Sequence, residues 1–201
     1  MTLKTHHESF DINPIGYVES GYHSFSEVPH PPGKGGWNED TSTIALCPEH
    51  AGEISGLDGY SHIIVLFWIH KSREWKMPKH DHHDSHDFHG SHDSHDHNQN
   101  HNTTQHHHNH SHSHKPAHVK VFATRMPVRP NPIGLSVVEL MGFSPESGIV
   151  TVKGLDALNG TPILDIKPYI PNFDSYPEAN LPEWVGKHLR EHQQIHTEEE
   201  G

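Results

Sequence analysis

Two segments of this chain carry charged residues in settings that could bind a small polar or anionic ligand. In the first, FATRMPVRPNPIGLS at 122–136, three prolines fix backbone φ angles and bias the preceding residues toward extended geometry. We therefore expect a stiff loop that presents Arg125 and Arg129. Guanidinium groups held in this way can bind a carboxylate or phosphate bidentately, although pairing with surface acids is an equally good interpretation.

The second segment is LDALNGTPILDIKPYIPNFDS at 155–175, which places a carboxylate next to a turn. Asn159 and Gly160 can supply the positive φ angles of that turn, and Asp156 comes just before it. Such a carboxylate suits a cationic or polyhydroxyl ligand, but taken by itself it is more typical of backbone capping. Asp165 and Lys167 are two apart on a predicted strand and therefore share a face.

A histidine-rich tract fills residues 80–114, with aspartates between the histidines. A tract of this composition forms no hydrophobic core, so we expect the main function in its flanks. Imidazole with occasional carboxylate suits nickel, zinc, cobalt or copper, and weak multi-site binding is predicted. The alternative is a tolerated surface insertion. The candidate metal ligands are His82, His83, His86, His106, His107, His108, His110, His112 and His114.

The elements that must position these residues are mostly strands. Short strand-like runs separated by Gly, Pro and Asn predict an all-β fold, most simply a barrel. The run at 63–69 is apolar at every position, which predicts a strand buried on both faces at the centre of the core. The predicted strands fall at 12–20, 41–47, 62–69, 118–124, 133–143, 149–155 and 162–170.

One helical pattern stands at the C-terminal end. Trp184, Val185 and Leu189 recur at helical spacing, which predicts a short helix packed on the sheet. His188, His192 and His196 share one face of it and are read as a solvated face rather than a metal site. The predicted organisation is a flexible N-terminus at 1–11, a barrel domain at 12–175 interrupted by a disordered His-rich insertion at 79–117, and a helix with an acidic tail at 176–201.

Composition narrows the classes of partner and compartment. The net charge is −12, and neither the tract nor the chain on either side of it is basic, which counts against a broad electrostatic grip on nucleic acid but leaves room for a local patch. The single cysteine, Cys47, cannot form an internal disulfide, and no apolar signal opens the chain, so a cytoplasmic location is expected. No apolar run approaches the roughly twenty residues that span a bilayer.

Three segments in this order, LDGYSHIIVLFWIH, FATRMPVRPNPIGLS and LDALNGTPILDIKPYIP, resemble the TsaA-like family, whose best-known members are the TrmO tRNA methyltransferases. The resemblance covers roughly residues 12–175 apart from the His tract. It implies a compact antiparallel β-barrel, usually a homodimer, that binds S-adenosylmethionine without a Rossmann domain. The activity that it implies is N6-methylation of threonylcarbamoyladenosine at tRNA position 37.

The resemblance also implies a set of site residues. Arg125 is a candidate for the methionyl carboxylate of the cofactor, and Asp156 for a ribose hydroxyl or the amino group. No general base can be assigned. The implied cofactor contacts are Ile69, His70, Arg125, Leu135, Asp156, Ala157, Leu158 and Asn159, and the substrate-binding candidates are Arg129, Asn131, Asp165 and Lys167.

Two departures from the family pattern keep other functions open. The family usually reads Pro-Arg-Gln near the N-terminus, where this chain has VPHPPGKGG and only Pro29 matches. The connection after the first of the three segments, often Arg-rich in the family, is here the His tract. The alternatives are therefore a TsaA-like methyltransferase with a substrate other than tRNA, and a metal-binding storage or sensor protein that uses the tract.

Overall fold

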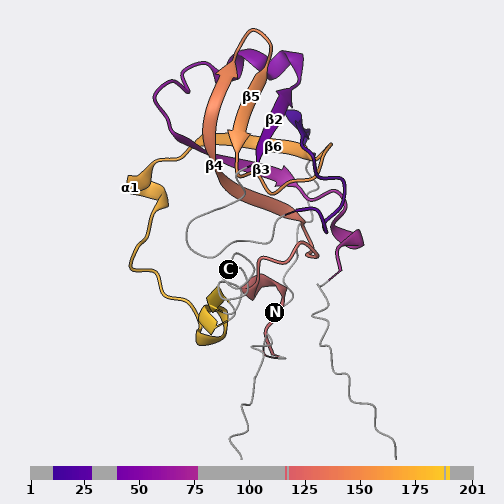
Figure 1. Cartoon of the computed structure of the whole chain (residues 1–201), viewed down its shortest axis with the longest axis vertical. Helices are drawn as coiled ribbons and strands as arrows, with labels where there is room; N and C mark the ends of the chain where they lie inside the picture. The colour runs from indigo at the N-terminus through magenta and orange to yellow at the C-terminus, as the bar shows by residue number, and fades with distance from the viewer. Residues whose placement is uncertain (1–10, 29–39, 77–115, 117, 188, 191–201) are drawn as a thin grey trace, which may run out of the picture.

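A closed antiparallel barrel forms the body of the molecule, as the sequence predicted (Figure 1). The computed structural model describes residues 11–28, 40–76, 116, 118–187 and 189–190. Neighbouring strands follow the order β1-β2-β5-β4-β3-β6, and β1 closes the barrel against β6. The strands are β1 Gly16–Glu19, β2 Thr41–Leu46, β3 His62–Trp68, β4 Ile133–Ser144, β5 Ile149–Lys153 and β6 Pro162–Pro168.

Besides the C-terminal helix described below, the helical elements are short. They are the 3₁₀ turns η1 Pro48–Ile54, η2 Ser72–Glu74 and η3 Val121–Ala123, and one α-helical turn, α1 Pro171–Asp174. Across the part of the chain that the structure describes, no helix combines the length and apolar character needed to cross a membrane.

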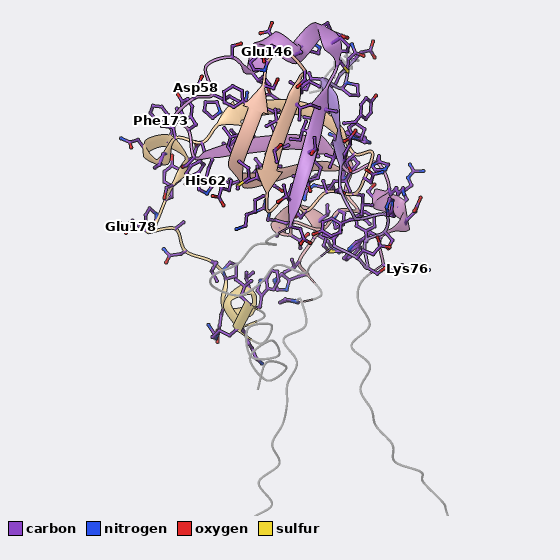
Figure 2. The ribbon with its side chains drawn as sticks, turned by 45° about the horizontal axis from the view of Figure 1, so that its top comes forward. Asp58, His62, Lys76, Glu146, Phe173 and Glu178 are labelled. Carbon is purple, nitrogen blue, oxygen red and sulfur yellow. The ribbon has the colours of Figure 1, made fainter. Side chains whose placement is uncertain are left out.

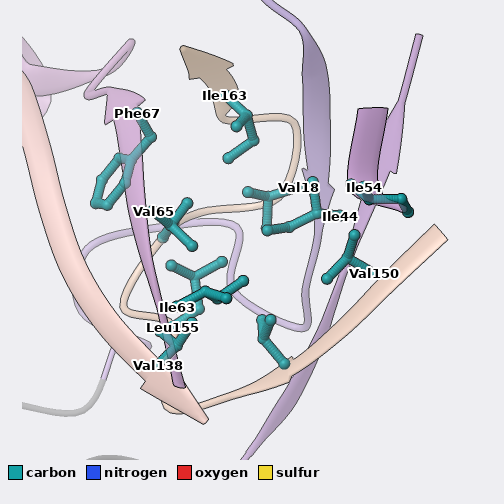
Figure 3. Close-up of a cluster of buried hydrophobic side chains, with 12 residues drawn as sticks. Val18, Ile44, Ile54, Ile63, Val65, Phe67, Val138, Val150, Leu155 and Ile163 are labelled. Atoms are coloured by element: carbon teal, nitrogen blue, oxygen red, sulfur yellow. The ribbon is translucent and has the colours of Figure 1, made fainter. Parts of the chain in front are cut away.

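The core lies inside the barrel, and β3 contributes to it from one face (Figure 3). Ile63, Val65 and Phe67 point inward and are at most 5% exposed. The prediction that β3 is buried on both faces is wrong, because a barrel wall has only one inner face: Ile64 and Leu66 are half-buried and Trp68 is 36% exposed. The outer face of β3 is apolar nonetheless.

The predicted strand at 118–124 is not a strand. Val119 is buried, but the chain then enters η3, and Phe122 is 78% exposed. Strand-like alternation needs a partner with an open edge, and a closed barrel offers none. The C-terminal helix is present at residues 183–187 and 189–190, although Figures 1 and 2 draw it away from the barrel strands instead of packed on them.

The segment between β5 and β6 crosses the end of the barrel. Leu155 and Ala157 are buried in the core, and Thr161 N donates to Leu158 O at 3.1 Å to close a turn. Within this turn Gly160 alone has a positive φ, 76°, so the expectation of a positive φ at Asn159 is wrong. A single glycine at the third turn position is what a type II turn requires.

Candidate functional site

A small open hollow of about 20 Å³ lies where β3 ends against the crossing segment. Its walls combine apolar side chains with a histidine, a lysine and a carboxylate, and apolar walls with a few polar groups are typical of small-molecule sites. The lining residues are Phe25, Phe67, Ile69, His70, Lys71, Asp156, Ala157, Leu158 and Thr161.

The end of β3 positions one wall of the hollow. Ile69 N donates to Pro132 O at 2.7 Å, and Ser72 N donates back to Ile69 O at 3.0 Å as the chain turns into η2. Between them the His70 ring approaches the crossing segment, with Nδ1 3.4 Å from Thr161 Oγ1. The backbone at residues 69–72 is therefore bonded to the segment before β4 at Ile69 and closed by its own turn at Ser72.

Hydrogen bonds from β4 and from the chain after β1 fix the opposite wall. Ser136 Oγ donates to Asp156 Oδ1, so the carboxylate bonds a side chain on β4, and not the turn that it was expected to cap. Ser20 Oγ donates to Ala157 O at 3.0 Å, and Ser20 N donates to Asn159 Oδ1 at 3.2 Å. The crossing segment is thus tied to β4 and to the chain after β1, which lies more than a hundred residues away in sequence.

The surroundings of His70 favour the neutral form of its imidazole. Partial burial lowers the pKa of His70, the adjacent Lys71 ammonium lowers it further, and Glu74 opposes the change. Removing water penalises the charged imidazolium more than the neutral ring, and a neighbouring cation adds repulsion. At neutral pH the hollow therefore presents an uncharged imidazole beside a lysine.

Five of the eight predicted cofactor residues line this hollow, namely Ile69, His70, Asp156, Ala157 and Leu158. The other three lie outside its lining. Arg125 Nη2 donates to Leu135 O at 2.9 Å, which ties the proline-rich loop to β4. Asn159 is occupied in the bond with Ser20 described above.

The predicted substrate residues lie on two different parts of the barrel. Arg129 Nη1 donates to Thr124 O at 3.2 Å, and Asn131 O accepts from Ile133 N at 2.8 Å, so both belong to the proline-rich loop. Asp165 and Lys167 form an ion pair of 2.5 Å on β6. Neither of these two lines the hollow.

The predicted metal ligands of the His tract, His82 to His114, lie outside the described residues, as do Pro29 and the predicted helix-face residues His188, His192 and His196. Among the residues that the structure does describe, no group of three or more His, Cys, Asp or Glu side chains is arranged to hold a metal ion.

Four lining residues and one supporting residue escaped the sequence interpretation. Phe67 and Lys71 share the alternation of Ile69 along one side of the chain, so continuing the β3 pattern past the strand could have found them. Thr161 follows the predicted turn directly. Phe25 and Ser136 carry no local signal, because only the closed barrel brings them to the crossing segment.

Two segments that adjoin the hollow are rich in basic residues although the whole chain is acidic. Residues 71–76, which follow β3, and residues 118–132, which precede β4, contain a single acidic residue, Glu74. Figure 2 places Lys76 on the side of the molecule away from Glu146 and Asp58. We call the six basic side chains of these two segments the basic rim: Lys71, Arg73, Lys76, Lys120, Arg125 and Arg129.

Comparison with known proteins places the barrel among relatives. The family model described as tRNA-methyltransferase O N-terminal domain matches residues 17–175. An Archaeoglobus fulgidus protein named S-adenosyl-L-methionine-binding protein is 31% identical over 166 residues, which cover 81% of this chain and 91% of that protein. The Escherichia coli tRNA (adenine(37)-N6)-methyltransferase is 30% identical over 176 residues, covering 86% of this chain and 63% of the enzyme.

A solved structure agrees with these sequence relatives. The crystal structure of TrmO from Pseudomonas aeruginosa superposes with a TM-score of 0.58 at 28% identity, covering 86% of this chain and 62% of that chain. The present chain therefore spans less than two thirds of the E. coli and P. aeruginosa proteins.

Proposed function

This chain belongs to the tRNA-methyltransferase O N-terminal domain family, and from that premise we propose that it transfers a methyl group from S-adenosylmethionine to N6 of adenosine 37 in tRNA. The observation that carries the proposal is the convergence of Ile69 and His70 with residues 156–158 on one hollow. Two of the three family-like segments, distant in sequence, supply these groups. The third segment, at 122–136, runs into β4, and the bond from Arg125 to Leu135 joins its loop to its strand part.

The residues of the hollow are suited to the parts of S-adenosylmethionine. When bound, this cofactor supplies an electrophilic methyl group on a sulfonium, so the protein acts mainly by positioning the two reactants. Ser136 orients the Asp156 carboxylate toward a ribose hydroxyl or amino group, and Phe25 and Phe67 offer apolar contact area. A neutral His70 adds no further positive charge to that of Lys71 beside a sulfonium.

The basic rim supports a polyanionic methyl acceptor. Lys and Arg side chains that neutralise phosphates release bound counterions, and this release provides much of the affinity for nucleic acids. A rim with a single acid, on a chain with a net charge of −12, favours tRNA over the alternative of a substrate without phosphates. Within the rim, Arg129 is our candidate for the threonylcarbamoyl carboxylate.

We extend the proposal to a homodimer formed through the outer face of β3 and β4. Ile133, Leu135, Val137 and Met141 on this face are 40–53% exposed, and Trp68 on β3 is 36% exposed. A contiguous apolar face of this kind marks an interaction site. Val137→Lys should convert a dimer to a monomer in sedimentation experiments, whereas a wild-type protein that sediments as a monomer contradicts the extension.

The test of the methyltransferase proposal uses tRNA from cells that lack this protein. Mass spectrometry of the tRNA nucleosides should show loss of methylated threonylcarbamoyladenosine, restored by the wild-type gene and not by Asp156→Asn. Purified protein should label the same nucleoside from methyl-labelled S-adenosylmethionine. Unchanged methylation in a deletion strain that has no second enzyme of this activity contradicts the proposal.

The composition of residues 80–114 supports a second proposal, weak binding of nickel, zinc or cobalt by the tract. Isothermal titration with nickel should detect several sites on the intact protein and none when residues 80–114 are replaced by a short Gly/Ser linker. Equal nickel binding by the two proteins removes the tract as a metal site.

A further inference from the structure

Phe122 is the most exposed large apolar side chain among the described residues, at 78%. It lies in η3, between Lys120 and Arg125 of the basic rim. An aromatic ring that stays exposed leaves its apolar area unburied, and a ring between cationic residues offers a flat face on which a planar, negatively charged ligand can stack.

The ring is held on an ordered base. Ala123 N donates to Lys120 O at 3.0 Å and Thr124 N donates to Val121 O at 3.1 Å, which closes the 3₁₀ turn. The Thr124 hydroxyl adds a bond to Val121 O at 2.9 Å. These bonds fix the backbone that carries Phe122, so a ligand that stacks on the ring pays little to order that backbone.

The same segment borders the hollow. Arg125 anchors it to β4 through Leu135 O, and Ile69, a lining residue of the hollow, donates to Pro132 O in the same segment. Phe122 therefore belongs to the proline-rich loop that leads into β4 and that is bonded to Ile69 of the hollow.

We propose that Phe122 is a stacking platform for an unpaired base of RNA whose backbone phosphates contact the basic rim. Proteins bind single-stranded RNA in this way, with aromatic side chains that stack on bases inside a positively charged surface. The charge of this segment favours RNA over an uncharged ligand, because residues 118–132 contain three Lys or Arg and no acid, which suits a polyanion. The RNA follows from the proposed function, whereas the stacking role follows from the geometry of the loop.

The experiment measures RNA affinity by fluorescence anisotropy with two probes of equal charge, a single-stranded oligonucleotide and a hairpin duplex. Phe122→Ala should weaken single-strand binding about tenfold, since stacking of one base contributes roughly 5- to 150-fold, and should leave duplex binding unchanged. Phe122→Tyr, which keeps the π face, should bind like wild type, whereas Phe122→Leu should behave like the alanine variant.

Phe173→Ala is the matched control. Phe173 is 70% exposed but is followed by Asp174, and Figure 2 shows it on the far side of the barrel from Lys76. We expect this variant to bind both probes as wild type does. S-adenosylmethionine affinity, measured by titration calorimetry, should be equal in all of these proteins, because Phe122 lies outside the lining of the hollow.

Several outcomes overturn the inference: single-strand affinity that Phe122→Ala does not change, a leucine variant as good as tyrosine, equal losses for both probes, or a wild-type protein that binds no RNA. A Phe122→Ala protein that changes from dimer to monomer also overturns it, since the ring would then be covered by a second copy. Failure of the methyltransferase proposal is recognised separately, by wild-type protein that methylates no tRNA while Phe122→Ala still weakens single-strand binding.

Discussion

The ring of Phe67 on β3 occupies the space that a side chain would take at Gly134, its register partner on β4. A Cβ added at Gly134 would overlap the ring carbons Cε2 and Cζ and would come within 2.8 Å of Cδ2. Phe67 is both a core residue and a wall of the hollow. The missing side chain at Gly134 therefore allows one ring to fill the core and shape the site.

Replacing Gly134 with alanine should force the Phe67 ring out of its position. We expect a loss of unfolding free energy of about 1–3 kcal/mol, the usual cost of overpacking, together with weaker S-adenosylmethionine binding. Urea unfolding and titration calorimetry measure the two effects. Gly142→Ala on the same strand is the control, because a Cβ there meets nothing within 4 Å. Equal stability and affinity of the two variants contradict the role of the ring.

The hydrogen bond from Ser136 to Asp156 should matter for the ligand more than for the fold. Ser136→Ala leaves the Asp156 carboxylate without the partner that orients it, so we expect cofactor affinity to fall about tenfold, the value of a typical hydrogen bond to a charged group. Ser144→Ala removes a similar serine–carboxylate bond, to Glu146 at 3.0 Å, from the other end of β4. If calorimetry gives the two variants the same affinity for S-adenosylmethionine, Asp156 is not part of the binding site.

The strands and part of the site follow from local sequence, whereas the pairing across the barrel does not. The place of β3 follows from its apolar run and the turn at Gly160 from its residue type, whereas the alternating burial of β3 does not, because every residue from Ile63 to Trp68 is apolar. The sequence at 118–124 is also strand-like but forms no strand, because strand formation depends on a neighbouring edge that tertiary structure supplies or withholds.

The contacts that complete the hollow depend on tertiary structure and not on local sequence. Ser20 and Ala157 are brought together only because β1 closes the barrel against β6, and no local pattern encodes that closure. Arg125 illustrates the same limit. Both a ligand carboxylate and a surface acid were reasonable partners from its sequence, yet its guanidinium bonds the backbone of Leu135.

The positive φ of Gly160 sets the shape of the crossing segment. Gly160→Ala should cost about 1 kcal/mol of unfolding free energy through backbone strain alone, because a Cβ there would meet nothing within 4 Å. Gly160→Asn should cost less, since asparagine tolerates this conformation better. Gly52→Ala, where φ is not positive and the space is equally open, should show no strain. Equal unfolding free energies for the three variants in urea would contradict this account.

Acidification should weaken cofactor binding through His70. Because burial lowers the pKa of this imidazole, the folded chain takes up its proton less readily than the unfolded chain, whose value is about 6.5. The His70 contribution to the unfolding free energy is therefore constant above about pH 6.5 and is lost as the pH falls through the lowered pKa.

A protonated His70 would also place a cation beside Lys71 and repel a sulfonium. Calorimetry from pH 8 to pH 5 should show S-adenosylmethionine affinity falling for wild type and for His62→Gln, at the other end of β3, but much less for His70→Gln. Parallel curves for all three proteins would show that His70 does not sense the bound cation.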